Sequence, residues 1–199
     1  MERTTKDRIL DEALVMFAEH GYKGTNLRDL AARLELSKSA LYKHYASKED
    51  IWNALLDKME AYYAQRFGSM DNLPPAPDSW EAFMQMMMGM ISFTVHDPQI
   101  ILTRKLLTTE QFHDARVCKL ATKHFLEGTA NIYAKVFEGM MEKGLLKKSD
   151  PAMLAFSFTA PISALIHLCD REPDRHDEAL GRMDAYVKYF IATHAVKEK

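Results

Sequence analysis

A short run of basic, hydroxyl and aromatic side chains between Lys38 and Lys48 is well suited to contact nucleic acid. Residues 36–48 contain three lysines and no carboxylate, whereas residues 1–50 as a whole hold nine basic and nine acidic groups. Lysines neutralise phosphates, and hydroxyl groups donate to phosphates or to base edges. The net charge of −2 for the 199-residue chain does not exclude such binding, because affinity depends on charges placed at phosphates.

Helical geometry separates these side chains into two faces. With about 100° per residue and Lys38 at zero, Leu41 and Tyr45 fall at about 300° and 340°. Both residues therefore anchor a helix that is predicted over roughly residues 38–45. The opposite face is polar and suits a major groove, where base edges offer donors and acceptors. Its members are Lys38, Ser39, Tyr42 and Lys43, with His44 at the margin.

The preceding segment predicts a partner helix for this one. Apolar residues recur there with the i, i+3, i+4, i+7 spacing of an amphipathic helix. They are Leu27, Leu30, Ala31 and Leu34. Either Thr25 or Asn26 caps this first helix, and Ser37 caps the second. Since only Glu35 and Leu36 lie between them, the two helices form a helix-turn-helix.

Flanking helices complete a three-helix head and connect it to the rest of the chain. Residues 5–20 carry an apolar face and end at Gly21, which is suited to a left-handed C-terminal position. Ser47 begins a capping box, so a fourth helix is predicted from there to about Phe67.

These features together resemble the TetR family of transcriptional regulators. The matching positions are Ile9 to Phe17, Gly21-Tyr22, Thr25, Leu30-Ala31, Ser37, Leu41-Tyr42, His44-Tyr45 and Ser47-Lys48-Glu49. The resemblance implies a homodimer with a helix-turn-helix DNA-binding domain at residues 1–46 and a helical effector-binding and dimerisation domain at 47–199. The implied function is repression at a palindromic operator in double-stranded DNA, relieved by a small-molecule effector that the sequence does not identify.

Carried over position by position, the resemblance implies two groups of DNA contacts. The phosphate contacts are Thr25, Tyr42 and Lys48, and the base contacts are Lys38, Ser39 and Lys43, with Ala40 against a thymine methyl and His44 beside them. One turn position departs from the family pattern, because Glu35 stands where glycine is usual. Glutamate is strained there if the positive φ is kept.

The remainder of the chain predicts helices and no strands, so the fold class is all-α. A linker is predicted around Pro74, Pro75 and Pro77, and helices over residues 79–95, 98–106, 114–143, 151–170 and 174–195. Gly144 is a natural stop for the third of these helices. Pro161 predicts a kink in the fourth.

Methionines at residues 84–90 allow two interpretations. Flexible thioethers can line a pocket for apolar ligands, although buried methionines more often fill a core. The family resemblance favours an effector site between the long connecting helix and the middle helices. Its candidate lining residues are Tyr62, Met87, Met88, Ile91, Phe125, Thr129 and Tyr133.

The last two helices carry the predicted dimer surface, which two subunits would join as a four-helix bundle. The candidate residues are Phe156, Ala160, Ala164 and His167 on one helix, and Met183, Tyr186, Tyr189 and Phe190 on the other. The alternative is that these residues pack within the monomer. Pairing would place two heads about one helical turn of DNA apart, or a multiple of it.

Other classes of protein find less support. Motifs for zinc hydrolases, phosphate-binding loops and serine hydrolases are absent, so neither an enzyme nor a metal or cofactor is predicted. An architectural DNA-binding protein without an effector is the alternative, with a helical enzyme behind it. The sequence shows no signal peptide and no apolar run near the roughly 20 residues that span a bilayer. A cytoplasmic protein without a membrane partner is therefore expected.

Overall fold

The computed structural model describes residues 4–68, 73 and 75–196, and part of the predicted linker, Pro74, lies outside them. The described residues form helices, with a single isolated bridge between Leu146 and Ala195. The all-α prediction is confirmed.

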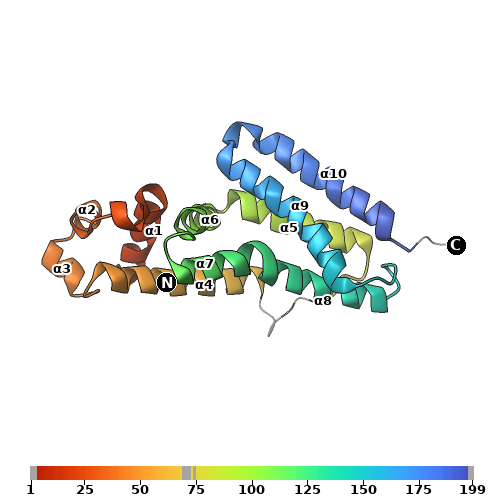
Figure 1. Cartoon of the computed structure of the whole chain (residues 1–199), viewed down its shortest axis with the longest axis horizontal. Helices are drawn as coiled ribbons and strands as arrows, with labels where there is room; N and C mark the ends of the chain where they lie inside the picture. The colour runs from red at the N-terminus through yellow and green to blue at the C-terminus, as the bar shows by residue number, and fades with distance from the viewer. Residues whose placement is uncertain (1–3, 69–72, 74, 197–199) are drawn as a thin grey trace. The chain divides into compact units, whose positions relative to one another are not determined.

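The helices divide into two compact units (Figure 1). The head unit comprises Met1–Phe67 and Leu102–Ala121, and the body unit Gly68–Ile101 and Thr122–Lys199. The head unit holds α1 (Thr5–Gly24), α2 (Leu27–Arg33), α3 (Lys38–Tyr42), α4 (Lys48–Phe67), most of α6 (Pro98–Glu110) and α7 (Ala115–Thr122). The body unit holds α5 (Trp80–His96), the π-helix η1 (Lys123–Glu127), α8 (Gly128–Glu142), α9 (Pro151–Arg171), the short 3₁₀ turn η2 (Pro173–Arg175) and α10 (His176–His194). The predicted domain boundary at residue 46 falls inside the head unit, between α3 and α4.

Three aromatic rings join α1 to α4 in the head unit. The Phe17 ring is fully buried, and its centroid lies 5.0 Å from that of Trp52 in an edge-to-face arrangement. Tyr22 completes the group at 5.9 Å from Phe17 and 5.0 Å from Trp52. Gly21 makes this possible, because its φ of 71° ends the regular part of α1 and turns Tyr22 back onto Trp52. The predicted stop at Gly21 is confirmed.

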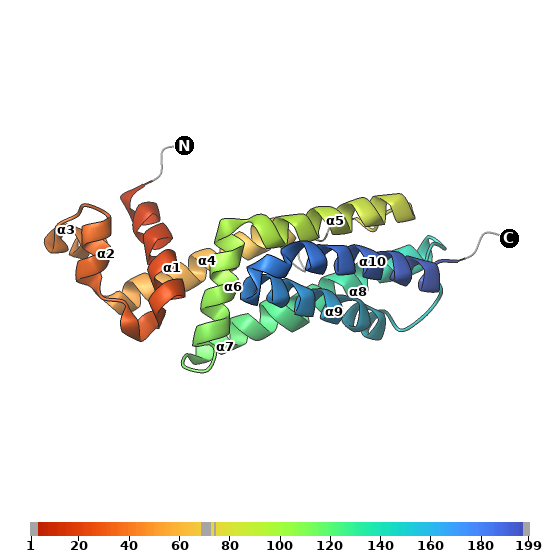
Figure 2. The same ribbon diagram turned by 90° about the horizontal axis from the view of Figure 1, so that it is seen from above.

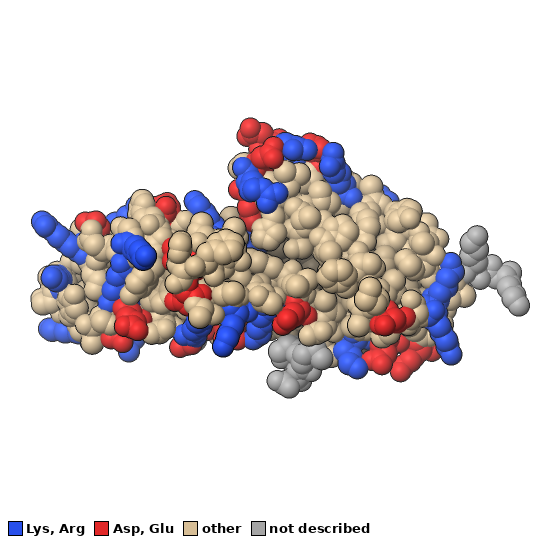
Figure 3. Space-filling view, viewed as in Figure 1, with Lys and Arg blue, Asp and Glu red and all other residues tan. Residues whose placement is uncertain are grey.

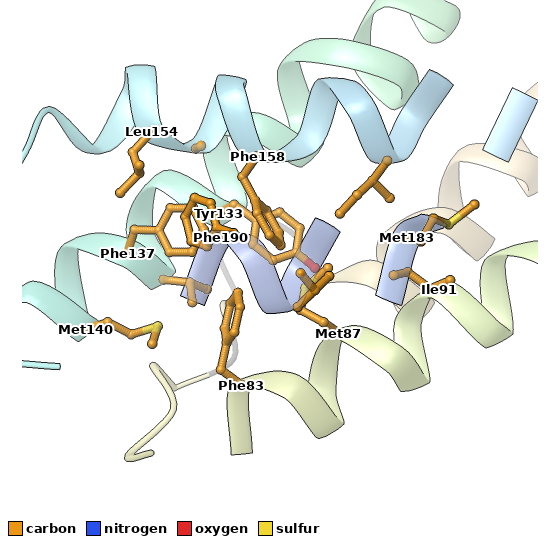
Figure 4. Packing of buried hydrophobic residues seen from close by; sticks show 14 of the residues in the cluster. Phe83, Met87, Ile91, Tyr133, Phe137, Met140, Leu154, Phe158, Met183 and Phe190 are labelled. Carbon is orange, nitrogen blue, oxygen red and sulfur yellow. The ribbon is translucent and has the colours of Figure 1, made fainter. Parts of the chain in front are cut away.

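Helices α5, α8, α9 and α10 enclose the core of the body unit, and α9 and α10 lie antiparallel beside each other (Figures 1 and 2). Phe158 stands at the centre of this core, with ring centroids 4.5 Å from Phe190 and 5.4 Å from Phe137. Met87 and Met183 are buried in the same cluster (Figure 4). These methionines act as core residues in the structure.

Pro161 lies inside α9 and leaves one carbonyl of that helix without its usual donor. Proline has no N–H to offer to the carbonyl four residues earlier, which belongs to Ser157. The hydroxyl of Tyr186, on α10, donates to this Ser157 oxygen at 2.6 Å. The proline therefore creates an acceptor that ties α9 to α10.

The helix predicted over residues 114–143 is interrupted by the π-helix η1. A side chain at Gly128 would place its Cβ 2.6 Å from the Lys123 carbonyl oxygen, so this close approach requires glycine. The Thr129 hydroxyl donates to the carbonyl of His124 at 3.2 Å. Gly144, at a φ of 73°, follows the end of α8 as predicted.

Helix α9 corrects one expectation about membranes. Its length and composition would be sufficient to cross a bilayer, contrary to the prediction that no apolar run approaches that length. In the structure α9 buries Leu154, Phe158 and Ile162 among the other helices of the body unit. This packing accounts for part of the apolar composition of the helix.

The turn between α2 and α3 holds a strained residue. Glu35 has a φ of 57°, the only positive value among the non-glycine residues that the structure describes. The Glu35 N–H donates to the Ala32 carbonyl at 3.1 Å, and the positive φ of Glu35 turns the Leu36 N–H towards the Ala31 carbonyl, to which it donates at 2.9 Å. The turn thus keeps the geometry that normally calls for glycine and is not reshaped around Glu35, at a cost of about 1 kcal/mol.

Replacing Glu35 should therefore stabilise the head. We expect Glu35→Gly to raise the free energy of unfolding by roughly 0.5–1 kcal/mol, because the left-handed penalty outweighs the added chain entropy of glycine. Urea denaturation measures the change, and Glu35→Ala is the control, since alanine keeps the strain. An equal gain in both variants would assign the effect to the side chain instead of the backbone.

Candidate nucleic-acid interface

Asn26 caps α2, and its neighbour Thr25 is buried. The Asn26 side chain accepts hydrogen bonds from the N–H groups of Arg28 and Asp29, at 3.0 and 2.9 Å. Thr25 is only 2% exposed, and its hydroxyl donates to the carbonyls of Met16 and Gly21 at 3.1 and 2.9 Å. The fold therefore uses the Thr25 hydroxyl, so any phosphate contact of the predicted residue Thr25 would have to come from its backbone.

Helix α3 separates its side chains as the sequence predicts. Ser37 caps it by accepting from the Ala40 N–H at 3.1 Å, and Leu41 is fully buried beneath it. Tyr42 is 41% exposed. The other exposed members of the outward face are Lys38, Ser39 and Lys43, while Ala40, His44 and Tyr45 are partly buried. The helix ends at Tyr42, earlier than predicted, and turns continue to Tyr45.

An open groove of about 560 Å³ adjoins α3 in the head unit. Its lining residues are Lys23, Thr25, Asn26, Leu27, Arg28, Lys38, Tyr42, Ala46, Ser47 and Lys48. Four of these are basic and none is acidic, so the groove attracts anions. In Figure 3 lysine and arginine side chains project from the end of the head that carries α2 and α3. Sequence reasoning missed Lys23 and Arg28, although both flank the α2 cap and carry positive charge.

Lys48 occupies the inner wall of this groove. Its ammonium group donates to the Thr25 carbonyl and lies 4.4 Å from the centroid of the Tyr22 ring. Burial lowers the pKa of Lys48, and the negative charge of Glu110 opposes that shift. Lys48 is thus held in place by protein groups while it lines the groove.

Glu110, at the end of α6, holds the Tyr22 backbone beside Lys48. The side chain is 8% exposed, and its Oε1 accepts a hydrogen bond from the Tyr22 N–H at 3.1 Å. A Cβ at Gly21 would lie 2.7 Å from the same oxygen. Because 88 residues separate Glu110 from Tyr22, no local sequence signal identifies the contact.

Asp114 supplies a second attachment between α4 and the segment after α6. Its Oδ2 accepts from the Trp52 indole N–H at 2.9 Å, and its Oδ1 accepts from the N–H groups of Arg116 and Val117. Burial acts to raise the pKa of Asp114, but the hydrogen bond from Trp52 and those from the backbone outweigh it and lower the pKa. The carboxylate therefore stays charged and caps α7.

The predicted effector residues lie in different surroundings. Tyr62 belongs to the head unit, whereas Met87, Ile91 and Tyr133 are buried in the body core, with Met88 packed against it. The Phe125 ring lies 4.9 Å from that of His167, in an edge-to-face arrangement.

The predicted dimer residues divide into surface and core. Phe156 and Tyr189 are 48% and 65% exposed, and Met153, which was not predicted, is 63% exposed. Ala164 is also exposed, whereas Ala160, His167 and Tyr186 are partly buried. The prediction is wrong for Met183 and Phe190, because both are core residues of the body unit. The hydroxyl of Tyr186 is likewise committed within the monomer, to Ser157.

The head is a helix-turn-helix domain. It has two short capped helices, α2 and α3, and α3 buries Leu41 and exposes a basic and aromatic face. The groove beside α3 extends its basic surface. No group of three or more potential metal ligands occurs within the described part of the chain. The class of protein is therefore a helix-turn-helix protein with an all-helical body.

Comparison with known proteins narrows this class. Residues 9–55 match the model of bacterial regulatory proteins of the tetR family. Over 58 residues the chain is 38% identical to the biofilm operon icaADBC HTH-type negative transcriptional regulator IcaR of Staphylococcus epidermidis. That match covers 29% of this chain and 31% of the relative, or about a third of its length. The helix-turn-helix head of this chain therefore carries the sequence pattern of bacterial regulatory proteins of the tetR family.

Solved structures extend the likeness of fold to nearly the whole chain. SmeT is the repressor of a Stenotrophomonas maltophilia multidrug efflux pump. The structure of its complex with triclosan matches this chain with a TM-score of 0.73 at 19% identity. The match covers 98% of this chain and 93% of that one. A regulator from Saccharomonospora viridis, in complex with choline, has a TM-score of 0.70 at 16% identity and covers 96% of this chain and 98% of that one.

The Glu110 contact can be tested through its hydrogen bond. Glu110→Ala leaves the part-buried Tyr22 N–H without an acceptor, so we expect the free energy of unfolding to fall by about 1–3 kcal/mol. Glu110→Gln keeps an acceptor oxygen and should lose less. Urea denaturation followed by tryptophan fluorescence measures both. Equal losses in the two variants would show that the negative charge, and not the hydrogen bond, stabilises the head.

Proposed function

We propose that the protein is a cytoplasmic DNA-binding transcriptional repressor, which binds a palindromic operator as a homodimer and is released by a small-molecule effector. The observation that carries this proposal is the groove beside α3, with basic side chains and no carboxylate in its lining. Phosphate groups of a duplex bear the charge that such a surface attracts. The name of the S. epidermidis relative, a negative transcriptional regulator, supports repression.

Base contacts are assigned to the exposed face of α3. Lys38, Ser39 and Lys43 point to solvent there, and lysine and serine can bond to base edges in the major groove. Ala40 and His44 are partly buried beside them and keep their proposed contacts at the edge of this face.

Phosphate contacts are assigned to the groove and its rim. Tyr42 offers an exposed hydroxyl, and Lys48 a positive charge on the wall. Lys23 and Arg28 join this set because they line the same groove. Thr25 takes a positioning role, since its carbonyl accepts from the Lys48 ammonium.

Dimerisation is assigned to the exposed apolar side chains of α9 and α10. Met153, Phe156 and Tyr189 are large, apolar and exposed, and a second copy would cover them. Figure 3 shows a wide area without charged side chains over α9. A two-fold pairing through these helices would give one dimer two reading heads.

Effector binding is assigned to the body unit. Solved structures with this fold have been obtained with triclosan and with choline bound to those proteins. The body core contributes methionines and aromatic rings, which suit an apolar ligand. A ligand would release DNA by favouring a state in which the two heads no longer fit their half-sites.

Selection of bound sequences from random duplexes tests the proposal as a whole. We expect a palindrome, because a symmetric dimer presents the same head to each half-site. No enrichment, together with binding that is equal for all sequences, would favour an architectural DNA-binding protein.

Single variants separate the two groups of contacts. Lys43→Ala or Lys38→Ala should change the preferred base at one position, with discrimination falling by about 1–3 kcal/mol.

Tyr42→Phe should weaken binding to all sequences. Arg28→Ala and Lys48→Ala should do the same and reduce the salt dependence by about one phosphate contact. Fluorescence anisotropy at several salt concentrations measures each, with the exposed Lys135→Ala as control. An unchanged salt slope for Lys48→Ala would remove that residue from the phosphate contacts.

The dimer surface has its own test. Phe156→Glu and Tyr189→Glu each place a charge on the proposed interface, so we expect monomers and a loss of operator affinity. Analytical ultracentrifugation measures the association, and Lys135→Glu, on the exposed side of α8, is the control. A variant that stays dimeric would show that another surface pairs the subunits.

A further inference from the structure

His96 and His176 are far apart in the sequence but lie together in the body unit. His96 is the last residue of α5, and His176 is the first residue of α10. The centroids of their rings are 5.0 Å apart, with an angle of 64° between the ring planes. His96 is exposed and His176 is partly exposed, so the pair can be reached from solvent. Neither residue belongs to the surfaces assigned to DNA, to dimerisation or to an effector.

A backbone carbonyl fixes the hydrogen on one ring nitrogen of His96. Its Nδ1 lies 2.8 Å from the Ser92 carbonyl oxygen, which can only accept, so in the neutral ring the hydrogen is on Nδ1. The Ser92 hydroxyl lies 3.4 Å from the same nitrogen. The other nitrogen, Nε2, therefore keeps its lone pair. Histidine ligands of metal ions are commonly held in this way, with a carbonyl on the nitrogen that does not bind the ion.

Asp177 acts on His176 in the same sense. Its Oδ1 lies 4.0 Å from Nδ1 of His176. This separation is too long for a hydrogen bond, but the negative charge favours the hydrogen on the nearer nitrogen. The lone pair of His176 is then on Nε2, as in His96.

The spacing of the two rings matches that of two ligands on one ion. A Zn–N bond is about 2.0–2.1 Å long, which places the centroid of a bound imidazole about 3.2 Å from the ion. Two such rings at a tetrahedral angle would have centroids roughly 5.2 Å apart. The observed separation of 5.0 Å is close to this value, and the rings are inclined to each other. Small rotations of the side chains would be enough to bind one ion between them.

The charge around the pair favours a cation. Residues 170–178 contain five acidic and two basic side chains. One of the basic residues, Arg175, is held in ion pairs with Glu172 and Glu178, at 3.2 and 2.9 Å. The C-terminal end of α5 and the N-terminal end of α10 bring opposite partial charges, so the acidic side chains decide the sign of the local potential.

We propose that His96 and His176 bind one divalent transition-metal ion through their Nε2 atoms. Imidazole suits Zn²⁺, Cu²⁺ and Ni²⁺. Water completes the coordination, because the described residues hold no group of three potential protein ligands. The ion joins the end of α5 to the start of α10 and stabilises the folded body unit, since the two ligands come together only on folding. This inference is independent of the proposed function.

Calorimetry of Zn²⁺ binding to the full chain, without an affinity tag, is the first test. We expect one ion per chain. His96→Ala and His176→Ala should each weaken binding by at least about tenfold, because losing a group that merely orients a ligand already costs about that much. The double variant should bind no more weakly than either single variant, since the chelate is lost with its first ligand. His113→Ala removes an exposed histidine of the head and is the matched control.

Electron paramagnetic resonance of bound Cu²⁺ counts the nitrogen ligands directly. Wild type with one equivalent of Cu²⁺ should show two imidazole nitrogens, and each single variant should show at most one. A wild-type spectrum with a single nitrogen would overturn the proposal.

Thermal unfolding separates a metal site from a pair of rings that only stack. Excess Zn²⁺ should raise the unfolding temperature of wild type above its value in EDTA and leave that of the double variant unchanged. The curves in EDTA show that each variant folds. If His96→Ala does not, His96→Gln keeps a donor for the Ser92 carbonyl and still removes the ligand.

Three further results would contradict the proposal. They are no binding of Zn²⁺ to wild type, equal binding to wild type and to both single variants, or losses that add in the double variant, as two separate sites would give. Stacking alone predicts that the variants lose the same stability with Zn²⁺ as in EDTA. Operator binding is not used in any of these measurements, so a failure of the proposed function would not affect them.

Discussion

The head depends on one buried carboxylate. Glu110 is almost fully removed from solvent, and a buried charge persists only when hydrogen bonds and opposite charges compensate it. The Tyr22 N–H supplies the hydrogen bond, and Lys48 supplies a nearby positive charge. Glycine is favoured at position 21 by its φ of 71°, and a Cβ there would also lie 2.7 Å from the same carboxylate. The turn after α1, the start of α4 and the end of α6 are thereby fixed together.

Local rules were enough to predict which side chains of α3 are buried and which face solvent. Ser37 as cap, Leu41 as anchor and Gly21 as stop follow from neighbouring residues. The strain at Glu35 is different, because only the structure shows that the turn keeps its positive φ. Glu110 could not be predicted in this way, because its partner is 88 residues away. The basic groove was only partly predicted for the same reason, since α1, α2, α3 and α4 all contribute to its lining.

In the body unit, helical periodicity identifies the apolar face of a helix but not the neighbour that covers it. An apolar stripe on α10 predicted a surface for a second subunit, but a stripe does not specify which neighbour covers it. Met183 and Phe190 face the core, while Tyr189, the residue directly before Phe190, is exposed. Pro161 is a similar case, because the sequence predicts only a kink in the helix. The structure adds that the proline leaves the Ser157 carbonyl without its usual donor, and that the Tyr186 hydroxyl donates to it.

Lys48 shows how this framework prepares a surface for an anion. A free surface lysine loses side-chain entropy when it binds a phosphate, and this loss offsets part of the electrostatic gain. Lys48 is already held by the Thr25 carbonyl and the Tyr22 ring, so little of that entropy remains to be lost. The same contacts keep the ammonium on the wall of the groove, where Glu110 opposes the effect of burial on its pKa. A phosphate entering the groove would therefore meet a positive charge that is already in position.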